Sequence, residues 1–259
     1  MKLSDYPAQE PLSEAGQAYS AECWKRSEGI GFSEEKYGAD AYQRLAIFRP
    51  KKPDGRVLLF WHGGGWTSGY KEWFGFMAPA FTEAGVTFIS AGYRLAPQHL
   101  FPAGLDDGYA ALAWVAQHVP GKIFIGGHSA GGHYAALIAA RQGAKLVQGC
   151  LPISGVYEFG EGSGLSMRPR FLGDALERTA SPRYELQAPL PPFLVAYGTK
   201  DFAHLIPQAE RFVEAVRAAG GSAEALPMEG RTHFTASFAG GEAEGPWVSA
   251  ALRFMSRNG

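Results

Sequence analysis

The sequence predicts an α/β fold, with a mostly parallel central sheet and helices on both of its faces. Short apolar runs alternate along the 259 residues with alanine-rich stretches that have a helical period. The apolar runs contain few polar residues. A strand with one solvated face would alternate, whereas a strand covered on both faces is apolar throughout. We therefore expect strands and crossover helices in alternation.

We expect strands, in chain order, at residues 45–48, 57–61, 86–91, 122–125, 147–153, 193–197 and 223–228. We expect helices at residues 71–84, 103–118, 130–142, 207–219 and 246–255. The helix at 207 illustrates the reasoning. Pro207 suits a first helical turn, and Gly220 follows the last turn, where a left-handed residue is favoured. Between them, Phe212, Val213 and Val216 form an apolar stripe at helical spacing.

A chain of this length suits one large domain, and we expect a single domain over residues 1–259. Two segments break the alternation. Residues 1–40 are polar and aromatic without a clear period, and residues 156–191 are rich in Gly, Pro and Arg. Neither composition supports a separate domain, so we interpret both as candidate cap segments over one edge of the sheet.

Composition excludes several classes of function. A formal net charge of −1 gives no support for nucleic acid or an anionic membrane as a partner. The apolar runs are shorter than the roughly 18 residues that a membrane span needs, and the N-terminal segment lacks the apolar core of a signal peptide. Cys23 and Cys150 form no CxxC pair, and the seven histidines show no metal-binding spacing. We expect a cytoplasmic protein with free thiols, no metal and no cofactor, of open oligomeric state.

A candidate nucleophile lies in the sequence GHSAG at residues 127–131, between an expected strand and an expected helix. A G-x-S-x-G motif in that setting is typical of a nucleophile elbow, a sharp turn that exposes the serine oxygen above the sheet. Ser129 is therefore the expected nucleophile. His128 and His133 flank it, and we interpret both as structural.

A serine hydroxyl needs a base and a carboxylate that orients the base. In this architecture the carboxylate precedes the histidine, and both follow the serine. Asp201 comes just after the strand at 193–197, and His233 comes after the next strand. Asp174 has no strand before it, Glu229 is very close to His233 in sequence, and His204 follows no expected strand. We therefore expect Asp201 and His233 to complete a triad.

Three consecutive glycines follow the expected strand at 57–61, between His62 and Trp66. Acyl transfer passes through an oxyanion, which preplaced backbone N–H groups stabilise. Glycine lets the backbone approach a substrate without a Cβ in the way. We expect Gly64, Gly65 and Ala130 to donate to the oxyanion. His62 would brace the loop by hydrogen bonds, and Trp66 would form a wall.

These motifs together resemble the α/β-hydrolase fold and, within it, the esterase and lipase group named after hormone-sensitive lipase. The resemblance rests on HGGGW, GHSAGGH, the aspartate after YGTK and the histidine in RTHF. YRLAPQHLFPAGLDD, residues 93–107, is similar to that group's Y-R-L-A-P-E-x-x-F-P-A-x-x-x-D stretch, with Gln98 in place of the usual glutamate. HGGGW also resembles the H-G-G-x-W pattern of kynurenine formamidases. The resemblance covers roughly residues 37–256 and implies the same triad and oxyanion donors.

The substrate stays open at this level. The compact chain favours a carboxylesterase that cleaves a small-molecule ester with a short acyl group. The alternative is a kynurenine formamidase that hydrolyses N-formylkynurenine, a formamide, with the same residues. A non-catalytic ligand-binding protein is less favoured, because such proteins usually lack a triad member. The aromatic residues expected to line the pocket are Trp66, Tyr70, Trp73, Tyr157, Phe159, Phe171 and Phe202.

Overall fold

A computed structural model describes residues 3–142, 145–167 and 169–259. Its strands are β1 Ser33–Lys36, β2 Arg44–Phe48, β3 Arg56–Trp61, β4 Thr87–Ala91, β5 Lys122–His128, β6 Gly149–Ile153, β7 Phe193–Lys200 and β8 Ala223–Thr232. Its α-helices are α1 Glu14–Ser27, α2 Ala78–Glu83, α3 Ala103–His118, α4 Ala130–Gln142, α5 Glu177–Ala180, α6 Leu205–Ala218, α7 His233–Phe238 and α8 Pro246–Asn258. Short 3-10 helices are η1 Leu3–Asp5, η2 Lys71–Met77, η4 Pro182–Tyr184 and η5 Ala239–Gly241.

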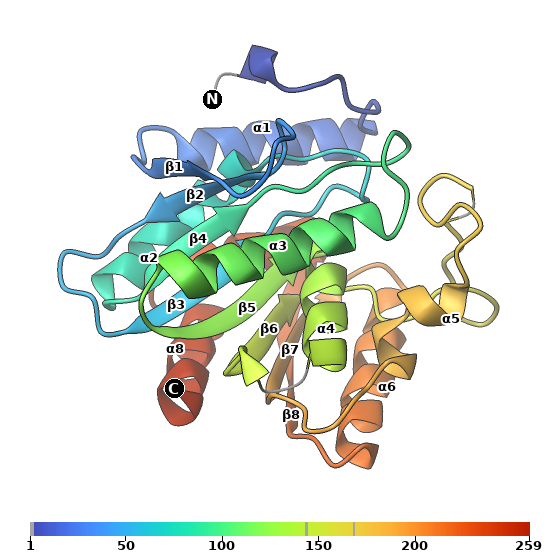
Figure 1. Cartoon of the computed structure of the whole chain (residues 1–259). Coiled ribbons are helices and arrows are strands. Elements are labelled where there is room, and N and C mark those ends of the chain that lie inside the picture. The colour runs from blue at the N-terminus through green and yellow to red at the C-terminus, as the bar shows by residue number, and fades with distance from the viewer. Residues whose placement is uncertain (1–2, 143–144, 168) are drawn as a thin grey trace.

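The described strands form one sheet in the order β1-β2-β4-β3-β5-β6-β7-β8 (Figure 1). Strand β2 runs antiparallel to β1 and β4. All other neighbours, from β4 to β8, pair in parallel. The expectation of a mostly parallel sheet is therefore confirmed.

The sheet separates two hydrophobic cores, and strand β3 shows how. Its side chains point alternately to opposite faces. Leu59 and Trp61 belong to the core under α3, α4 and α6. Leu58 and Phe60 belong to the core shared with α1, η2, α2 and α8. Figure 1 shows α3, α4 and α6 in front of the sheet and α8 behind it. Both faces are covered, as the continuous apolar strands predict.

The elements not expected from the sequence include β1, α1 and α7. Strand β1, at Ser33–Lys36, consists of four polar or charged residues and pairs with β2 at the edge of the sheet. Residues 33–36 of the candidate cap segment 1–40 therefore belong to the sheet. Helix α1 begins after Ser13, whose Oγ accepts a hydrogen bond from the N–H of Gly16. Helix α7 begins at His233 and is capped by Thr232.

Residues 71–84, expected as one helix, form η2 followed by the short helix α2. Helices α3 and α4 have the expected bounds, and α6 and α8 differ from the expected ranges by one to three residues at the ends that differ. In the described part of the chain, no helix is both long and apolar enough to cross a membrane.

The parallel strands bring the ends of β3, β5, β6 and β7 to one edge of the sheet. Trp61 pairs in register with Gly127, His128 with Ile153, and Ile153 with Ala196. Ligands in open α/β sheets bind beyond the carboxyl ends of such strands. The loops that carry the glycine run, the serine motif and Asp201 therefore meet at this edge.

Candidate active site

Ser129 occupies the sharp turn between β5 and α4, with a left-handed φ of 54°. Residues other than glycine rarely adopt this conformation, and those that do are often found at functional sites. The turn needs glycine close by, because a Cβ on Gly131 would lie 2.1 Å from the carbonyl oxygen of Trp61. The N–H of Ser129 donates to the carbonyl of Ile153 at 3.0 Å, which fixes the turn against β6. The fold thus holds the serine in a strained, half-buried position at the end of β5.

Ser129, His233 and Asp201 form one chain of hydrogen bonds. His233 Nε2 lies 2.9 Å from Ser129 Oγ, and His233 Nδ1 lies 2.8 Å from Asp201 Oδ1. A carboxylate only accepts hydrogen bonds, so Nδ1 carries the proton and Nε2 is free to accept the serine hydroxyl. This is the arrangement by which a histidine activates a serine.

The carboxylate of Asp201 is held by two further donors. Ser154 Oγ donates to Oδ2 at 2.5 Å, and the N–H of Phe202 donates to Oδ1 at 2.7 Å. Burial by itself would raise the pKa of Asp201. The hydrogen bond and charge of His233, with the donors from Ser154 and Phe202, outweigh burial and hold that pKa below its usual value. Asp201 is therefore kept as a carboxylate facing His233.

The glycine loop after β3 lies beside Ser129. Gly64 has a φ of 119°, and a Cβ there would lie 1.9 Å from the carbonyl oxygen of Ser68. Only glycine is compatible with this close approach. Within the described residues, the N–H groups of Gly64, Gly65 and Ala130 donate to no protein acceptor. Three N–H groups without a protein acceptor thus lie in the two segments that flank the serine site.

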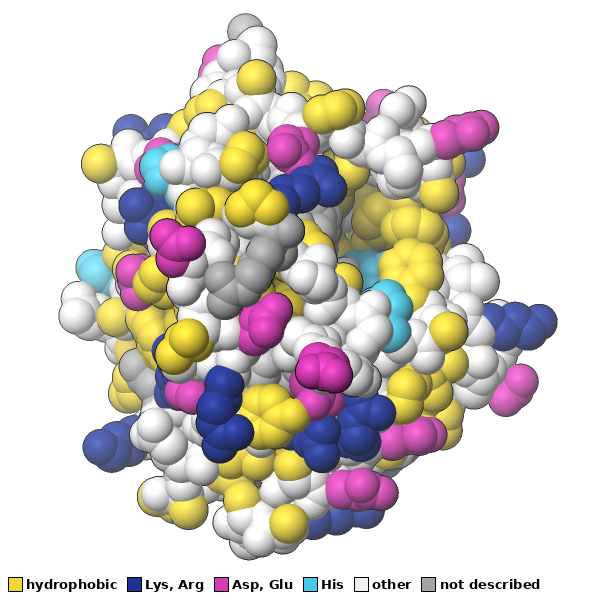
Figure 2. Space-filling view, turned by 90° about the vertical axis from the view of Figure 1, so that its right-hand side faces the viewer, with side chains coloured by type: hydrophobic (Ala, Val, Ile, Leu, Met, Phe, Trp, Pro, Cys, Tyr) yellow, Lys and Arg dark blue, Asp and Glu magenta, His cyan; other side chains and the backbone are white. Residues whose placement is uncertain are grey.

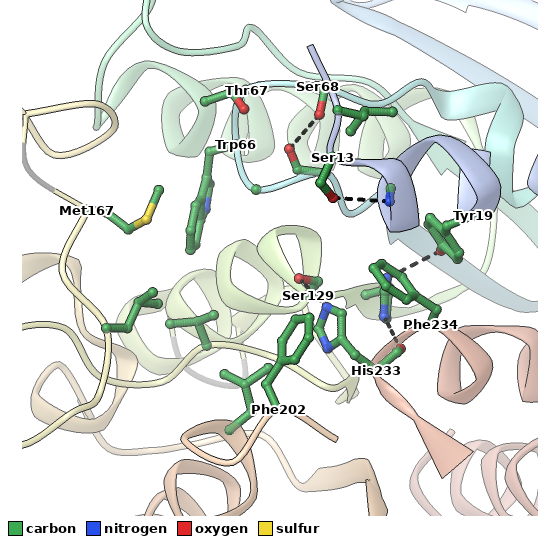
Figure 3. Close-up of a pocket in the computed structure, with 18 of the residues that line it drawn as sticks. Ser13, Tyr19, Trp66, Thr67, Ser68, Ser129, Met167, Phe202, His233 and Phe234 are labelled. Carbon is green, nitrogen blue, oxygen red and sulfur yellow. Dashed lines mark hydrogen bonds between the residues drawn. The ribbon is translucent and has the colours of Figure 1, made fainter. Parts of the chain in front are cut away.

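A cavity of about 510 Å³ opens above Ser129. Figure 2 shows a hollow on this face where hydrophobic and histidine side chains gather. Figure 3 shows Trp66 and Met167 on one side of Ser129, and Phe202, His233, Phe234 and Tyr19 on the other. The cavity is lined by Pro11, Leu12, Ser13, Gly16, Tyr19, Gly64, Gly65, Trp66, Thr67, Ser68, Trp73, His128, Ser129, Val156, Leu165, Met167, Arg170, Phe202, His204, Leu205, His233 and Phe234.

Four of the aromatic residues expected in the pocket are not among those that line it. Phe171 stacks on Trp66 with ring centroids 4.4 Å apart, and Phe159 packs against Trp66 at 5.5 Å. Tyr157 stacks on Phe212 of α6 at 4.4 Å. Phe171 and Phe159 therefore support the Trp66 wall of the cavity from behind, whereas Tyr157 packs on α6.

Tyr70 is the fourth, and it packs among aromatic residues of the N-terminal segment. Its ring centroid lies 5.0 Å from that of Tyr6 and 5.6 Å from that of Trp24. The sequence indicated aromatic side chains near the site, but not the direction in which each one points.

Residues of both candidate cap segments line the cavity. Leu12 and Tyr19 come from the N-terminal segment, and Leu165, Met167 and Arg170 come from residues 156–191. Sequence reasoning identified the segments but none of these residues, because neither segment has a period that shows which side chains point inward.

Two other residues of the site were missed or underrated. Ser154, at φ 50°, was not considered, although its positive φ and its place after β6 mark it in the structure. His128 was interpreted as structural, yet it lines the cavity and its Nε2 donates to the carbonyl of His233 at 3.0 Å. Burial, followed by the nearby His233, lowers the pKa of His128 to about 3, so its ring is neutral.

The rivals for the triad lie elsewhere. Asp174 and Glu229 are exposed on the surface. His204 lines the cavity beside Phe202, and burial followed by the charge of His233 lowers its pKa. Within the described ranges, no three His, Cys, Asp or Glu side chains come together as a group that could hold a metal ion.

Comparison with known proteins agrees with this fold. Residues 58–170 match the profile of a family described as alpha/beta hydrolase fold. A thermophilic esterase of Thermogutta terrifontis, solved with propionate bound, superposes with a TM-score of 0.75 at 26% identity, over 89% of this chain and 96% of that chain. The chain has the α/β-hydrolase fold.

The relatives of this α/β-hydrolase-fold protein include two esterases of Mycobacterium tuberculosis. The carboxylic ester hydrolase LipN is 31% identical over 242 residues, which are 78% of this chain and 64% of LipN. Esterase LipC is 31% identical over 260 residues, which cover 85% of this chain and 64% of LipC. The chain thus spans just under two thirds of the length of each.

Proposed function

We propose that this protein is a carboxylesterase, a serine hydrolase that cleaves small carboxylic esters through an acyl-enzyme. One observation carries the proposal: the hydrogen-bonded chain from Ser129 through His233 to Asp201 at the floor of the cavity. The esterase names of the M. tuberculosis relatives and of the T. terrifontis structure support the same class of substrate.

In this mechanism Ser129 Oγ attacks the ester carbonyl carbon while His233 Nε2 takes the hydroxyl proton. Asp201 stabilises the imidazolium that forms. The C–O bond to the alcohol then breaks, and His233 passes its proton to the departing oxygen. A water molecule, activated by the same histidine, hydrolyses the acyl-enzyme and restores the serine.

The oxyanion of each tetrahedral intermediate would be held by the N–H groups of Gly64, Gly65 and Ala130. Their lack of protein acceptors supports this role, because a donor already engaged would first have to break a bond. Each such donor is worth on the order of 3 kcal/mol in the transition state. His62 supports the loop, since its Nδ1 lies 2.6 Å from the carbonyl of Gly63 and its ring stacks on Tyr93 at 4.3 Å.

We also propose that the acyl group of the substrate is short. The protein is a single domain whose two cap segments cover the pocket, and its location is cytoplasmic. Propionate in the T. terrifontis esterase supports a short acyl chain. Two buried free thiols, Cys23 and Cys150, support a reducing compartment.

Substitution of the nucleophile tests the mechanism. Ser129→Ala should lower kcat for p-nitrophenyl acetate by about 10³-fold or more, because no other group can form the acyl-enzyme. Ser256→Ala, on the exposed side of α8, is the matched control and should keep wild-type kcat. A serine-directed phosphonate should label wild-type protein at Ser129. Residual turnover in Ser129→Ala near the wild-type rate would contradict the assignment.

A substrate panel tests the ester class. We expect kcat/KM to be highest for p-nitrophenyl acetate or butyrate and to fall for longer acyl chains, since the cavity of about 510 Å³ must hold both halves of the substrate. N-formylkynurenine belongs in the same panel. If its kcat/KM exceeded those of the two short esters by about tenfold, the formamidase alternative would replace the esterase proposal.

A further inference from the structure

The cavity differs in chemistry on the two sides of Ser129. Figure 3 shows Phe202, His233, Phe234 and Tyr19 together on one side, with Trp66 and Met167 across from them. The first side is a connected aromatic cluster. Phe202 lies 4.4 Å from His233 and 6.1 Å from Phe234, and Phe234 lies 5.0 Å from Tyr19, between ring centroids.

The chemistry of ester hydrolysis places the alcohol half of the ester on this aromatic side of Ser129. The departing alcohol oxygen must reach His233 Nε2 to receive its proton. The group attached to that oxygen therefore leaves Ser129 next to the His233 ring. Phe202 stacks on that ring at an interplanar angle of 23°, so it borders the path of the leaving group.

Phe202 is also unusually open for a phenylalanine. Its exposed fraction is 47%, although its neighbour Asp201 is buried. Seven large hydrophobic side chains of the described residues are exposed, and among these Phe202 alone lines the cavity over Ser129. An exposed aromatic ring in a binding cavity offers a contact surface to the ring of a ligand. The stack on His233 holds this surface in place.

We propose that the leaving-group subsite selects alcohols that carry an aromatic ring, and that Phe202 is its specificity-determining residue. The preferred substrates are esters of short-chain carboxylic acids with arylmethyl alcohols. The ring of the alcohol packs on Phe202, with Phe234 and Tyr19 closing the side of the subsite. This inference rests on the proposed esterase function and names the alcohol half of its substrate.

The test compares two acetates whose leaving groups match in everything but aromaticity: benzyl acetate and cyclohexylmethyl acetate. Both release a primary alcohol of similar acidity and similar size, and the cyclohexyl ring has the larger apolar surface. A merely apolar subsite would therefore favour the cyclohexylmethyl ester or neither. We expect kcat/KM for benzyl acetate to exceed that for cyclohexylmethyl acetate by about fivefold, within the range of ring–ring contacts.

Substitutions then test whether Phe202 causes the preference for benzyl acetate. Phe202→Leu should bring the ratio of the two kcat/KM values to about one, and Phe202→Tyr should keep it. Phe32→Leu is the matched control, because Phe32 is 39% exposed but lies outside this cavity, and it should keep the wild-type ratio. The ratio is measured within one preparation, so neither incomplete folding nor an altered His233 changes it. Thermal unfolding of each variant monitors the fold separately.

The outcomes separate this inference from the function on which it rests. A wild-type ratio near one, or a Phe202→Leu ratio equal to that of wild type, overturns the leaving-group proposal while p-nitrophenyl acetate hydrolysis leaves the esterase function standing. Cleavage of p-nitrophenyl acetate but not of benzyl acetate overturns it as well. A protein that hydrolyses no ester overturns both.

Discussion

At the scale of single residues, the support of Asp201 is the feature that the proposed mechanism depends on most. Its carboxylate must stay charged although it is buried. Three donors make this favourable: His233, the backbone of Phe202, and the hydroxyl of Ser154. Of the three, only Ser154 can be removed without changing the proposed triad or the backbone.

Ser154→Ala should therefore lower kcat/KM by about tenfold, the effect of losing one hydrogen bond to a charged group. We expect the loss in kcat rather than in KM, because Ser154 does not line the cavity. Initial rates on p-nitrophenyl acetate measure both constants, and Ser256→Ala serves again as the control. An unchanged kcat would show that His233 and the Phe202 backbone suffice.

At the scale of elements, helix α1 does more than cover the sheet. Tyr19 of α1 donates to Ser237 Oγ at 3.0 Å and lies 3.4 Å from His128 Nδ1. His128 in turn donates to the carbonyl of His233. The N-terminal helix is thus connected by two side chains to the backbone of the proposed base. A truncation that removes α1 would take away part of the site together with part of the core.

Tyr19→Phe isolates this connection from packing. The ring contacts with Trp73, Phe234 and Phe238 remain, but the hydroxyl is lost. We expect unfolding free energy to fall by about 1–2 kcal/mol, because a buried acceptor loses its donor. We also expect kcat to fall a few-fold as His233 becomes less firmly placed.

Tyr197→Phe is the matched control for Tyr19→Phe, since its hydroxyl makes one long bond of 3.3 Å to Glu210 and lies outside the cavity. Denaturant unfolding and steady-state kinetics measure the two effects. Equal kcat in both variants would limit α1 to a packing role.

At the scale of the whole molecule, the sheet was predictable because its parallel strands β3 to β7 are buried on both faces over most of their length. Strand β1 was not, because Ser33–Lys36 pairs through its backbone at the sheet edge and buries no apolar face. The site residues with motifs were predictable, since G-x-S-x-G and the glycine run impose backbone geometry that few other residues allow. Their mutual distances were not in the sequence, and they come from the register of β3, β5, β7 and β8.

The walls of the cavity were the least predictable part. Phe171 and Phe202 are both phenylalanines in loops near the site, yet one is buried behind Trp66 and the other faces the cavity. The residue type is the same in the two cases, and the path of the surrounding chain decides in which direction each side chain points. Substrate selectivity therefore depends on the part of the molecule that the sequence describes least.

Three buried histidines make the stability of the whole fold depend on pH. Burial lowers the pKa of His62 to about 4, of His128 to about 3 and of His133 to about 4. His133 shows the physical reason. Its Nε2 donates to the carbonyl of Ala180 at 2.7 Å, and its Nδ1 accepts from Trp66 Nε1 at 3.1 Å. A proton on Nδ1 would face another N–H, so the folded state holds this ring neutral.

The unfolded chain binds protons at these histidines below a pH of about 6.5, whereas the folded chain does not until about pH 4 at His62 and His133 and about pH 3 at His128. Their contribution to stability is therefore complete above pH 6.5 and is lost as pH falls towards 4. The free energy of unfolding falls by up to about 1.4 kcal/mol per pH unit for each histidine.

His133→Gln keeps one acceptor and one donor but cannot titrate. Its unfolding free energy, measured in denaturant from pH 7 to 4.5, should fall less steeply than that of wild type. His118→Gln, on the exposed end of α3, should follow the wild-type slope. Parallel slopes for wild type and His133→Gln would mean that the folded state takes up the proton at His133 as readily as the unfolded chain does.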